Sequence, residues 1–209
     1  IYFGSEQPPD PRPLHGPNLF PAHPADLRRA VLEYLGALTA LGHALLRGIA
    51  LGLGLDAQWF DRELTNDPTI LFRIFHYPPL ANTDDSWSVG EHTDYGLLTV
   101  LLQDGTGGLE VRARDGWRAV PPIPGAFVCN LGDMLERMTG GTYKSTPHRV
   151  RNPSDRGRVS CAFFFDPGWD ARVQAIPGVD VAGDDGTDRW DGVSVHAFSG
   201  TYGEYLIDK

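Results

Sequence analysis

A succession of short, apolar, strand-like runs separated by turn residues constrains the fold of this chain more than any other feature. The runs cover residues 70–77, 97–102, 109–111, 117–120, 126–131 and 158–165. Turn signals at intervals of about 8–12 residues are typical of antiparallel sandwiches and barrels. We therefore expect a mainly β fold with antiparallel strands.

Helical periodicity precedes these strands. Between residues 25 and 53, leucine, valine and isoleucine recur at three- and four-residue intervals, which predicts a long amphipathic helix. Asp56 is a suitable N-cap for a short second helix over residues 57–64. Residues 133–138 are expected to form a short helical turn. Residues 1–24 are rich in proline and glycine and predict a surface loop.

We expect a single domain spanning residues 1–209, because a chain of this length builds one substantial core. Residues 1–66 are expected to form an N-terminal loop and helices, and residues 67–170 the β core. Residues 171–209 are expected to form an acidic loop and a C-terminal segment. The aspartates within residues 178–192 lack regular calcium-ligand spacing, so we interpret that stretch as a solvated loop.

Charge and cysteine usage limit the partners and the compartment. The net charge of −9 argues against nucleic acid as a main partner, because phosphate binding needs a basic surface. We see no apolar run that approaches the roughly 18 residues of a membrane span. Cys129 and Cys161 lie in apolar runs, and we expect buried, reduced core thiols in a cytoplasmic protein. The oligomeric state stays open.

One imidazole and one carboxylate, His92 and Asp94, stand two positions apart. On a β-strand or its frayed end, side chains at this spacing share a face. A third ligand must come from elsewhere, and His148 lies far enough along the chain to return on a neighbouring strand. Two histidines and one carboxylate on one face of a metal are the ligands of non-haem Fe(II) oxygenases. His43, inside the long predicted helix, is interpreted as structural.

A second two-residue pattern follows His148. Arg158 and Ser160 share a face of a predicted strand and offer a fork of donors plus a hydroxyl to a carboxylate. Because they alternate with apolar residues, we expect both side chains to point inward.

Together these motifs resemble the isopenicillin N synthase-like branch of the Fe(II)/2-oxoglutarate-dependent dioxygenases. The resemblance covers residues 71–167 and rests on six motifs in the order typical of the family. They are Tyr77-Pro78-Pro79, His92-Thr93-Asp94-Tyr95-Gly96, Gly107-Gly108-Leu109, Asn130-Leu131-Gly132-Asp133, Lys144-Ser145-Thr146-Pro147-His148-Arg149-Val150 and Arg158-Val159-Ser160.

The resemblance implies a double-stranded β-helix, or jelly roll, buttressed by the long helix. It implies that His92, Asp94 and His148 bind Fe(II), and that O2 and the cosubstrate 2-oxoglutarate react there. It further implies that Arg158, Ser160 and Tyr77 hold the distal carboxylate of 2-oxoglutarate. Family members carry an additional N-terminal portion, which we expect to be missing from this sequence.

Three residues are candidates for a substrate pocket. Arg73 and Phe75 share the face of Tyr77, and Phe164 shares the face of Arg158. Arg73 suits an acidic substrate group or a structural ion pair, and Phe164 suits substrate contact or core packing. Asn130 and Asp133 are interpreted as turn-holding residues rather than catalysts.

The function expected first is hydroxylation, desaturation or cyclisation of a small molecule, as in secondary metabolism, with release of succinate and CO2. One alternative is a four-electron oxidase of the isopenicillin N synthase type, which needs no 2-oxoglutarate. A zinc hydrolase leaves the Arg158–Ser160 pair unexplained. A non-catalytic jelly-roll binding module should lack a complete ligand set.

Overall fold

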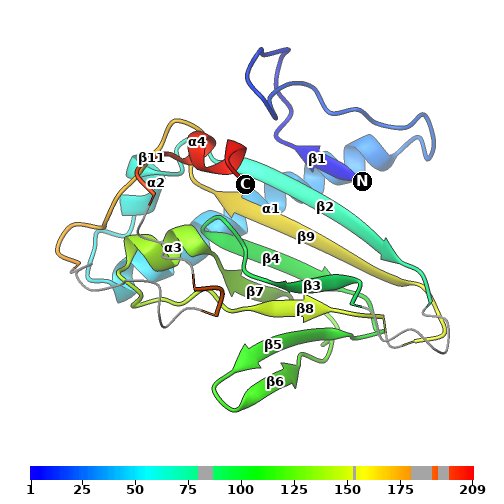
Figure 1. The fold of residues 1–209 in the computed structure, drawn as a ribbon. Helices are drawn as coiled ribbons and strands as arrows, with labels where there is room; N and C mark the ends of the chain where they lie inside the picture. Colours follow the sequence, from blue (N-terminus) through cyan, green and yellow to red (C-terminus); the bar gives the residue numbers. More distant parts are fainter. Residues whose placement is uncertain (80–86, 153, 180–189, 193–197) are drawn as a thin grey trace.

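Two antiparallel sheets form the body of the protein (Figure 1). The structure is a computed structural model that describes residues 1–79, 87–152, 154–179, 190–192 and 198–209. The larger sheet has the order β1-β2-β9-β4-β7 and the smaller one the order β3-β8-β5-β6. The strands of the larger sheet, in that order, are Tyr2–Gly4, Thr69–Tyr77, Arg158–Asp166, Leu98–Gln103 and Val128–Leu131. Those of the smaller sheet are Val89–His92, His148–Val150, Leu109–Ala113 and Gly116–Ala119.

Helices and a two-stranded ribbon complete the described chain. A small ribbon joins β10 (Arg172–Val173) to β11 (Gly200–Thr201). The helices α1 to α4 span Leu27–Gly52, Trp59–Glu63, Asp133–Met138 and Tyr202–Ile207. These elements confirm the predicted mainly β class with flanking helices, and the long helix lies where the periodicity placed it.

The alternation of side chains along β9 gives the larger sheet two different faces. Ser160 and Ala162 line a cavity between the two sheets. Phe163 and Phe165, one position out of step, are fully buried on the opposite face. This separation follows from the two-residue period of a strand. One face of the sheet builds the site, and the other builds the main core.

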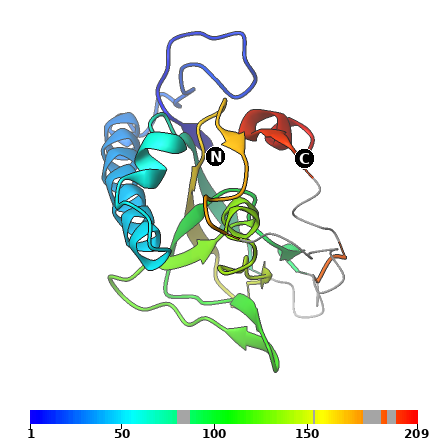
Figure 2. The same ribbon diagram turned by 90° about the vertical axis from the view of Figure 1, so that its left-hand side faces the viewer.

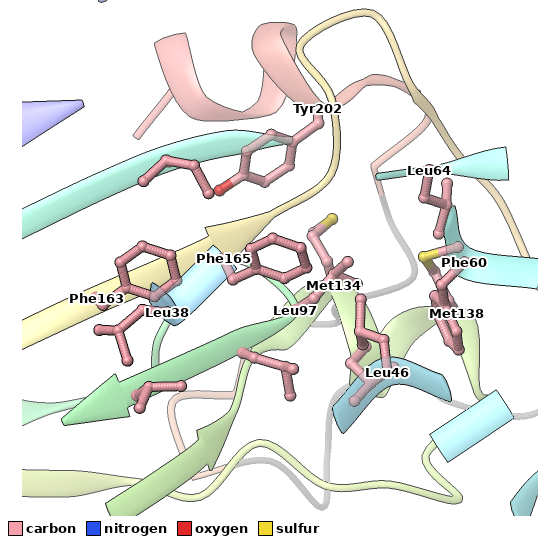
Figure 3. Close-up of a cluster of buried hydrophobic side chains, with 14 of the residues drawn as sticks. Leu38, Leu46, Phe60, Leu64, Leu97, Met134, Met138, Phe163, Phe165 and Tyr202 are labelled. Atoms are coloured by element: carbon pink, nitrogen blue, oxygen red, sulfur yellow. The ribbon is translucent and has the colours of Figure 1, made fainter. Parts of the chain in front are cut away.

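Helix α1 covers the core face of the larger sheet (Figure 2). Its residues Leu38 and Leu46 are buried in the same apolar cluster as Phe163 and Phe165 (Figure 3). Contact is close, because a Cβ added at Gly42 would lie 2.7 Å from the Phe165 ring. Burial of this apolar stripe, at about 25 cal/mol per Å², fixes the helix against the sheet.

The exposed side of α1 corrects one expectation from the sequence. The helix has 26 residues and is apolar over much of its length, so its length and composition alone would allow it to cross a membrane. The helix is apolar enough for this because small, uncharged residues also occupy its exposed side, namely Gly36, Ala40, Ala44 and Gly48. The apolar run was missed because a few charged residues interrupt it.

Two further expectations were wrong. The N-terminal stretch is not all loop, since β1 pairs with the edge of β2, placing Tyr2 opposite Arg73. Cys129 is exposed and Cys161 is half-buried, although both thiols are free as expected. Cys129 lies on β7, which pairs only with β4 and ends the larger sheet in the described chain. Most of the acidic stretch, residues 180–189, lies outside the described residues.

Candidate metal centre and its pocket

Strand pairing brings the three predicted metal ligands together. His92 ends β3, and its partner across the antiparallel pair is His148, the first residue of β8. Asp94 follows β3 by two residues, so its side chain returns to the same side. The residues that the sequence places far apart thus meet at one end of the smaller sheet.

The three side chains offer ligand atoms at close range. His148 Nε2 lies 3.7 Å and His92 Nε2 lies 4.0 Å from Asp94 Oδ1. One ligand atom from each residue lies within 4.8 Å of the other two. This spacing suits a common cation with nitrogen and oxygen ligands at about 2.0–2.2 Å.

Backbone carbonyls orient both imidazole rings. His92 Nδ1 donates to Gly90 O at 2.8 Å, and His148 Nδ1 donates to Thr146 O at 3.0 Å. Because a carbonyl only accepts, each Nδ1 carries the proton and each Nε2 presents a lone pair to the centre. Metal-ligating histidines are held in the same way.

Two features test whether these residues fit a metal ion. Asp94 Oδ2 is buried and has no hydrogen-bond partner within the described chain. Burial and the neighbouring His148 lower the pKa of His92, which favours the neutral ring that coordination requires. A divalent cation would supply the missing partner for the carboxylate, so the residues fit.

The pocket beside this centre has a volume of about 140 Å³ and lies between the two sheets. Apolar side chains form much of its wall, with a few convergent polar groups, as in small-molecule sites. Its lining residues are Arg73, Phe75, Tyr77, Val89, His92, Asp94, Thr99, Leu101, Leu109, Asn130, His148, Val150, Arg158, Ser160, Ala162 and Phe164.

Arg158 is completely buried in this pocket. Its Nε donates to Gly107 O at 2.5 Å and its Nη2 to Gln103 Oε1 at 3.1 Å. The guanidinium carbon lies 4.9 Å from the centre of the Tyr77 ring. Burial lowers the pKa of Arg158, while the nearby Tyr77 and Asp104 oppose that effect. Nη1 is buried without a hydrogen-bond partner among the described residues.

The structure gathers every predicted site residue in one cavity. Ser160 and Tyr77 lie beside Arg158, since Tyr77 is the strand partner of Arg158 and Ser160 follows two positions later. Arg73, Phe75 and Phe164 line the same space. His43 lies elsewhere, with its Nδ1 2.7 Å from Asp61 Oδ1, in keeping with its structural interpretation.

Sequence reasoning missed two polar lining residues. Thr99 of β4 and Asn130 of β7 are strand partners, and both are nearly buried at the cavity wall. Thr99 lies in a run that reads as apolar, and Asn130 was interpreted as a turn residue. The only available signal was a polar side chain inside each apolar strand.

A buried carboxylate supports the loop that carries Asp94. Asp166 Oδ2 accepts a hydrogen bond from the Tyr202 hydroxyl at 2.6 Å, and Oδ1 accepts from Leu97 N at 3.3 Å. Helix α4 is thereby connected to the start of β4. Burial raises the pKa of Asp166 to about 7, although both hydrogen bonds act in the opposite direction.

This carboxyl group gives an expected pH dependence. The pKa of about 7 in the folded chain compares with 3.8 for an ordinary aspartate, so Asp166 keeps its proton over a range where the unfolded chain loses it. Stability is therefore lost as pH rises from about 4 to about 7, by an amount on the order of 4 kcal/mol. Urea unfolding of the metal-free protein should show this slope. Asp166→Asn should lack it, and equal slopes in the two proteins would contradict the assignment.

Gly96 leaves the space that Asp166 occupies. A Cβ at Gly96 would lie 1.4 Å from Asp166 Oδ1. Gly96→Ala is therefore expected to destabilise the fold by about 3 kcal/mol, the upper end for overpacking. The matched control is Gly48→Ala on the exposed side of α1, where a Cβ meets nothing within 4 Å and should stabilise by about 0.5–1 kcal/mol. Chemical denaturation measures both, and equal stability of the two variants would contradict the packing described.

Comparison with known proteins places these features in a family. The sequence model of the 2OG-Fe(II) oxygenase superfamily matches residues 68–167. This match includes β2, the three clustered ligands and Arg158.

Similar proteins extend the match to the whole chain. A probable iron/ascorbate oxidoreductase of Dictyostelium discoideum is 43% identical over 100% of this chain and 66% of its own length. A 1-aminocyclopropane-1-carboxylate oxidase of Dictyostelium mucoroides is 36% identical over 100% of this chain and 67% of its own length. A full-length Neurospora crassa protein, solved in complex with alpha-KG and thymine, has a TM-score of 0.82 at 31% identity. That match covers 99% of this chain and 62% of the Neurospora chain. The chain thus spans about two thirds of the length of these relatives.

Proposed function

The chain belongs to the 2OG-Fe(II) oxygenase superfamily, and from this premise we propose that it is an oxidoreductase acting on a small molecule. The proposed reaction uses Fe(II), O2 and 2-oxoglutarate and releases succinate and CO2. The substrate is hydroxylated, desaturated or cyclised. His92, Asp94 and His148 are the proposed metal ligands.

The proposal rests on one observation: two buried polar atoms in the same pocket lack a hydrogen-bond partner in the described chain. Asp94 Oδ2 and Arg158 Nη1 are both buried without a partner in the described chain. A buried charged group without a partner is costly, so each position is suited to a ligand. A divalent cation satisfies the first group, and a carboxylate satisfies the second. A metal-chelating dicarboxylate such as 2-oxoglutarate connects the two positions.

The metal and its cosubstrate supply the oxidising power for the reaction. The protein holds both rings through carbonyl contacts that keep the proton on Nδ1, so each Nε2 would be free to bind the metal. Arg158 orients the distal carboxylate, with Ser160 and Tyr77 beside it. Leu101, Leu109 and Val150 contribute apolar walls that exclude water from the reacting groups.

A substrate screen tests the proposed function. Purified protein, Fe(II) and 2-oxoglutarate are incubated with candidate small molecules, and succinate is measured. We expect at least one compound to stimulate succinate release and to be oxidised in equal amount. Oxidation of a substrate without 2-oxoglutarate, and without succinate, would favour the four-electron oxidase instead.

A further inference from the structure

The pocket contains a second guanidinium, Arg73, on the same strand face as Tyr77. We infer that Arg73 binds an anionic group of the substrate, so that the enzyme acts on small carboxylic acids with an apolar body. This inference rests on the proposed function, because it takes Arg158 as the binding residue for 2-oxoglutarate.

Two aromatic rings fix the position of Arg73. Its guanidinium carbon lies 4.5 Å from the centre of the Tyr2 ring and 4.5 Å from the centre of the Phe75 ring. The Tyr2 hydroxyl accepts a hydrogen bond from Arg73 Nη2. Tyr2 belongs to β1 and reaches Arg73 because the two residues are strand partners. Tyr2 is therefore a positioning residue for Arg73.

Arg73 and Arg158 stand at opposite ends of an aromatic pair. Phe75 and Tyr77 stack with their centres 5.7 Å apart, and each ring also faces one guanidinium. Arg73 pairs with Ala162, whereas Tyr77 pairs with Arg158. Tyr77 lies four positions after Arg73 along β2, which is about 13 Å at the rise of an antiparallel strand. One dicarboxylate held at Arg158 and the metal therefore leaves Arg73 for another anion.

Arg73 has unused binding capacity toward the pocket. Its Nε is buried without a hydrogen-bond partner, and no carboxylate of the described chain forms an ion pair with it. Arg73 lines the same cavity as His92, Asp94 and His148, so an anion bound at Arg73 would lie in the same pocket as the reacting centre.

The summed charge of the cavity-lining residues, the metal and 2-oxoglutarate indicates the substrate class. Among the described residues that line the cavity, Arg73 and Arg158 are cationic and Asp94 is the carboxylate, with both histidines neutral at the metal. A divalent cation and doubly charged 2-oxoglutarate cancel each other, which leaves one excess positive charge. Buried charge is stabilised by pairing, and a carboxylate matches the guanidinium fork. A monoanionic substrate restores neutrality, and Phe75 and Phe164 offer apolar surface to its body.

Matched acids and amides test this inference. Phenylacetate is compared with phenylacetamide, and indole-3-acetate with indole-3-acetamide, because each pair differs mainly in charge. Binding is measured by calorimetry to protein saturated with Mn(II) and 2-oxoglutarate, so turnover does not contribute. We expect at least one acid to bind about tenfold or more tightly than its amide. Arg73→Gln should abolish that preference without weakening the amide, and Arg73→Lys should retain part of it.

Two controls make the result specific. Arg118→Gln, an exposed arginine of the β5–β6 hairpin that pairs with Asp115, should keep the acid preference. Tyr2→Phe should weaken acid binding less than Arg73→Gln, because the ring stays and the hydroxyl is lost. Absence of acid preference in every wild-type pair, or its persistence in Arg73→Gln, would overturn the inference. Failure of wild type to bind 2-oxoglutarate would instead reject the proposed function.

Discussion

Arg158→Gln is expected to raise the dissociation constant of 2-oxoglutarate by about a hundredfold or more. The reason is that Arg158 is fully buried and its Nη1 has no partner in the described chain, so it offers a charged donor to a buried carboxylate. Removing one partner of a buried ion pair costs about 3–5 kcal/mol, and every 1.4 kcal/mol is tenfold in affinity. Calorimetric titration of 2-oxoglutarate into the Mn(II)-loaded protein measures the change.

Two further variants test whether the loss of 2-oxoglutarate affinity is specific to the guanidinium of Arg158. Arg158→Lys should restore only part of the affinity, because an ammonium cannot reproduce the two-pronged contact of a guanidinium. Arg118→Gln, on the exposed hairpin, should leave the affinity unchanged. A melting temperature close to that of wild type shows that Arg158→Gln still folds. Unchanged 2-oxoglutarate affinity in a folded Arg158→Gln protein would remove Arg158 from the site.

His148→Ala is expected to lower metal affinity by more than about a hundredfold. His148 is nearly buried, and its Nε2 faces Asp94 at 3.7 Å. Losing an outer-shell partner already costs about 10–100-fold in metal affinity, and loss of a ligand itself should cost more. The fold should persist, since the substitution leaves the β8 backbone pairing in place. Titration with Mn(II), followed by its paramagnetic signal, measures the affinity.

The control for this variant is His76→Ala. His76 lies on β2 but is exposed, one position out of step with the cavity-lining Phe75 and Tyr77. Its removal should leave metal affinity unchanged. Full metal affinity in His148→Ala, or a comparable loss in His76→Ala, would show that the ligand set is assigned incorrectly.

The strand pattern carried most of the information about the fold and the site. The two-residue spacings of His92 with Asp94 and of Arg158 with Ser160 predicted shared faces, and each pair lies on one cavity wall. The pairing of His92 with His148 across β3 and β8 was not available from spacing, because it depends on long-range register. His148 was chosen as the third ligand because it lies far enough along the chain to return on a neighbouring strand, and the resemblance to a known family supported that choice.

Other features could not be predicted from the local sequence, because they depend on where a strand lies in a sheet. Tyr2 forms a strand only because the edge of β2 accepts it, although its surroundings read as a loop. Cys129 is exposed because β7 is the last strand of the larger sheet among the described residues, whereas its apolar neighbours predict burial. The domain boundaries, the cytoplasmic location and the roles assigned to the site residues stay predictions.

The coupling between metal and 2-oxoglutarate binding tests most directly whether the clustered ligands and Arg158 form one site. The measurement is calorimetric titration of 2-oxoglutarate into wild-type protein with and without Mn(II), repeated with His148→Ala. We expect one molecule bound per chain in the presence of the metal. Without Mn(II), or in His148→Ala, affinity should fall by about a hundredfold or more, because the carboxylate at Arg158 then binds without its chelated partner. Equal 2-oxoglutarate affinity in all three titrations, or no binding in any of them, would contradict the account.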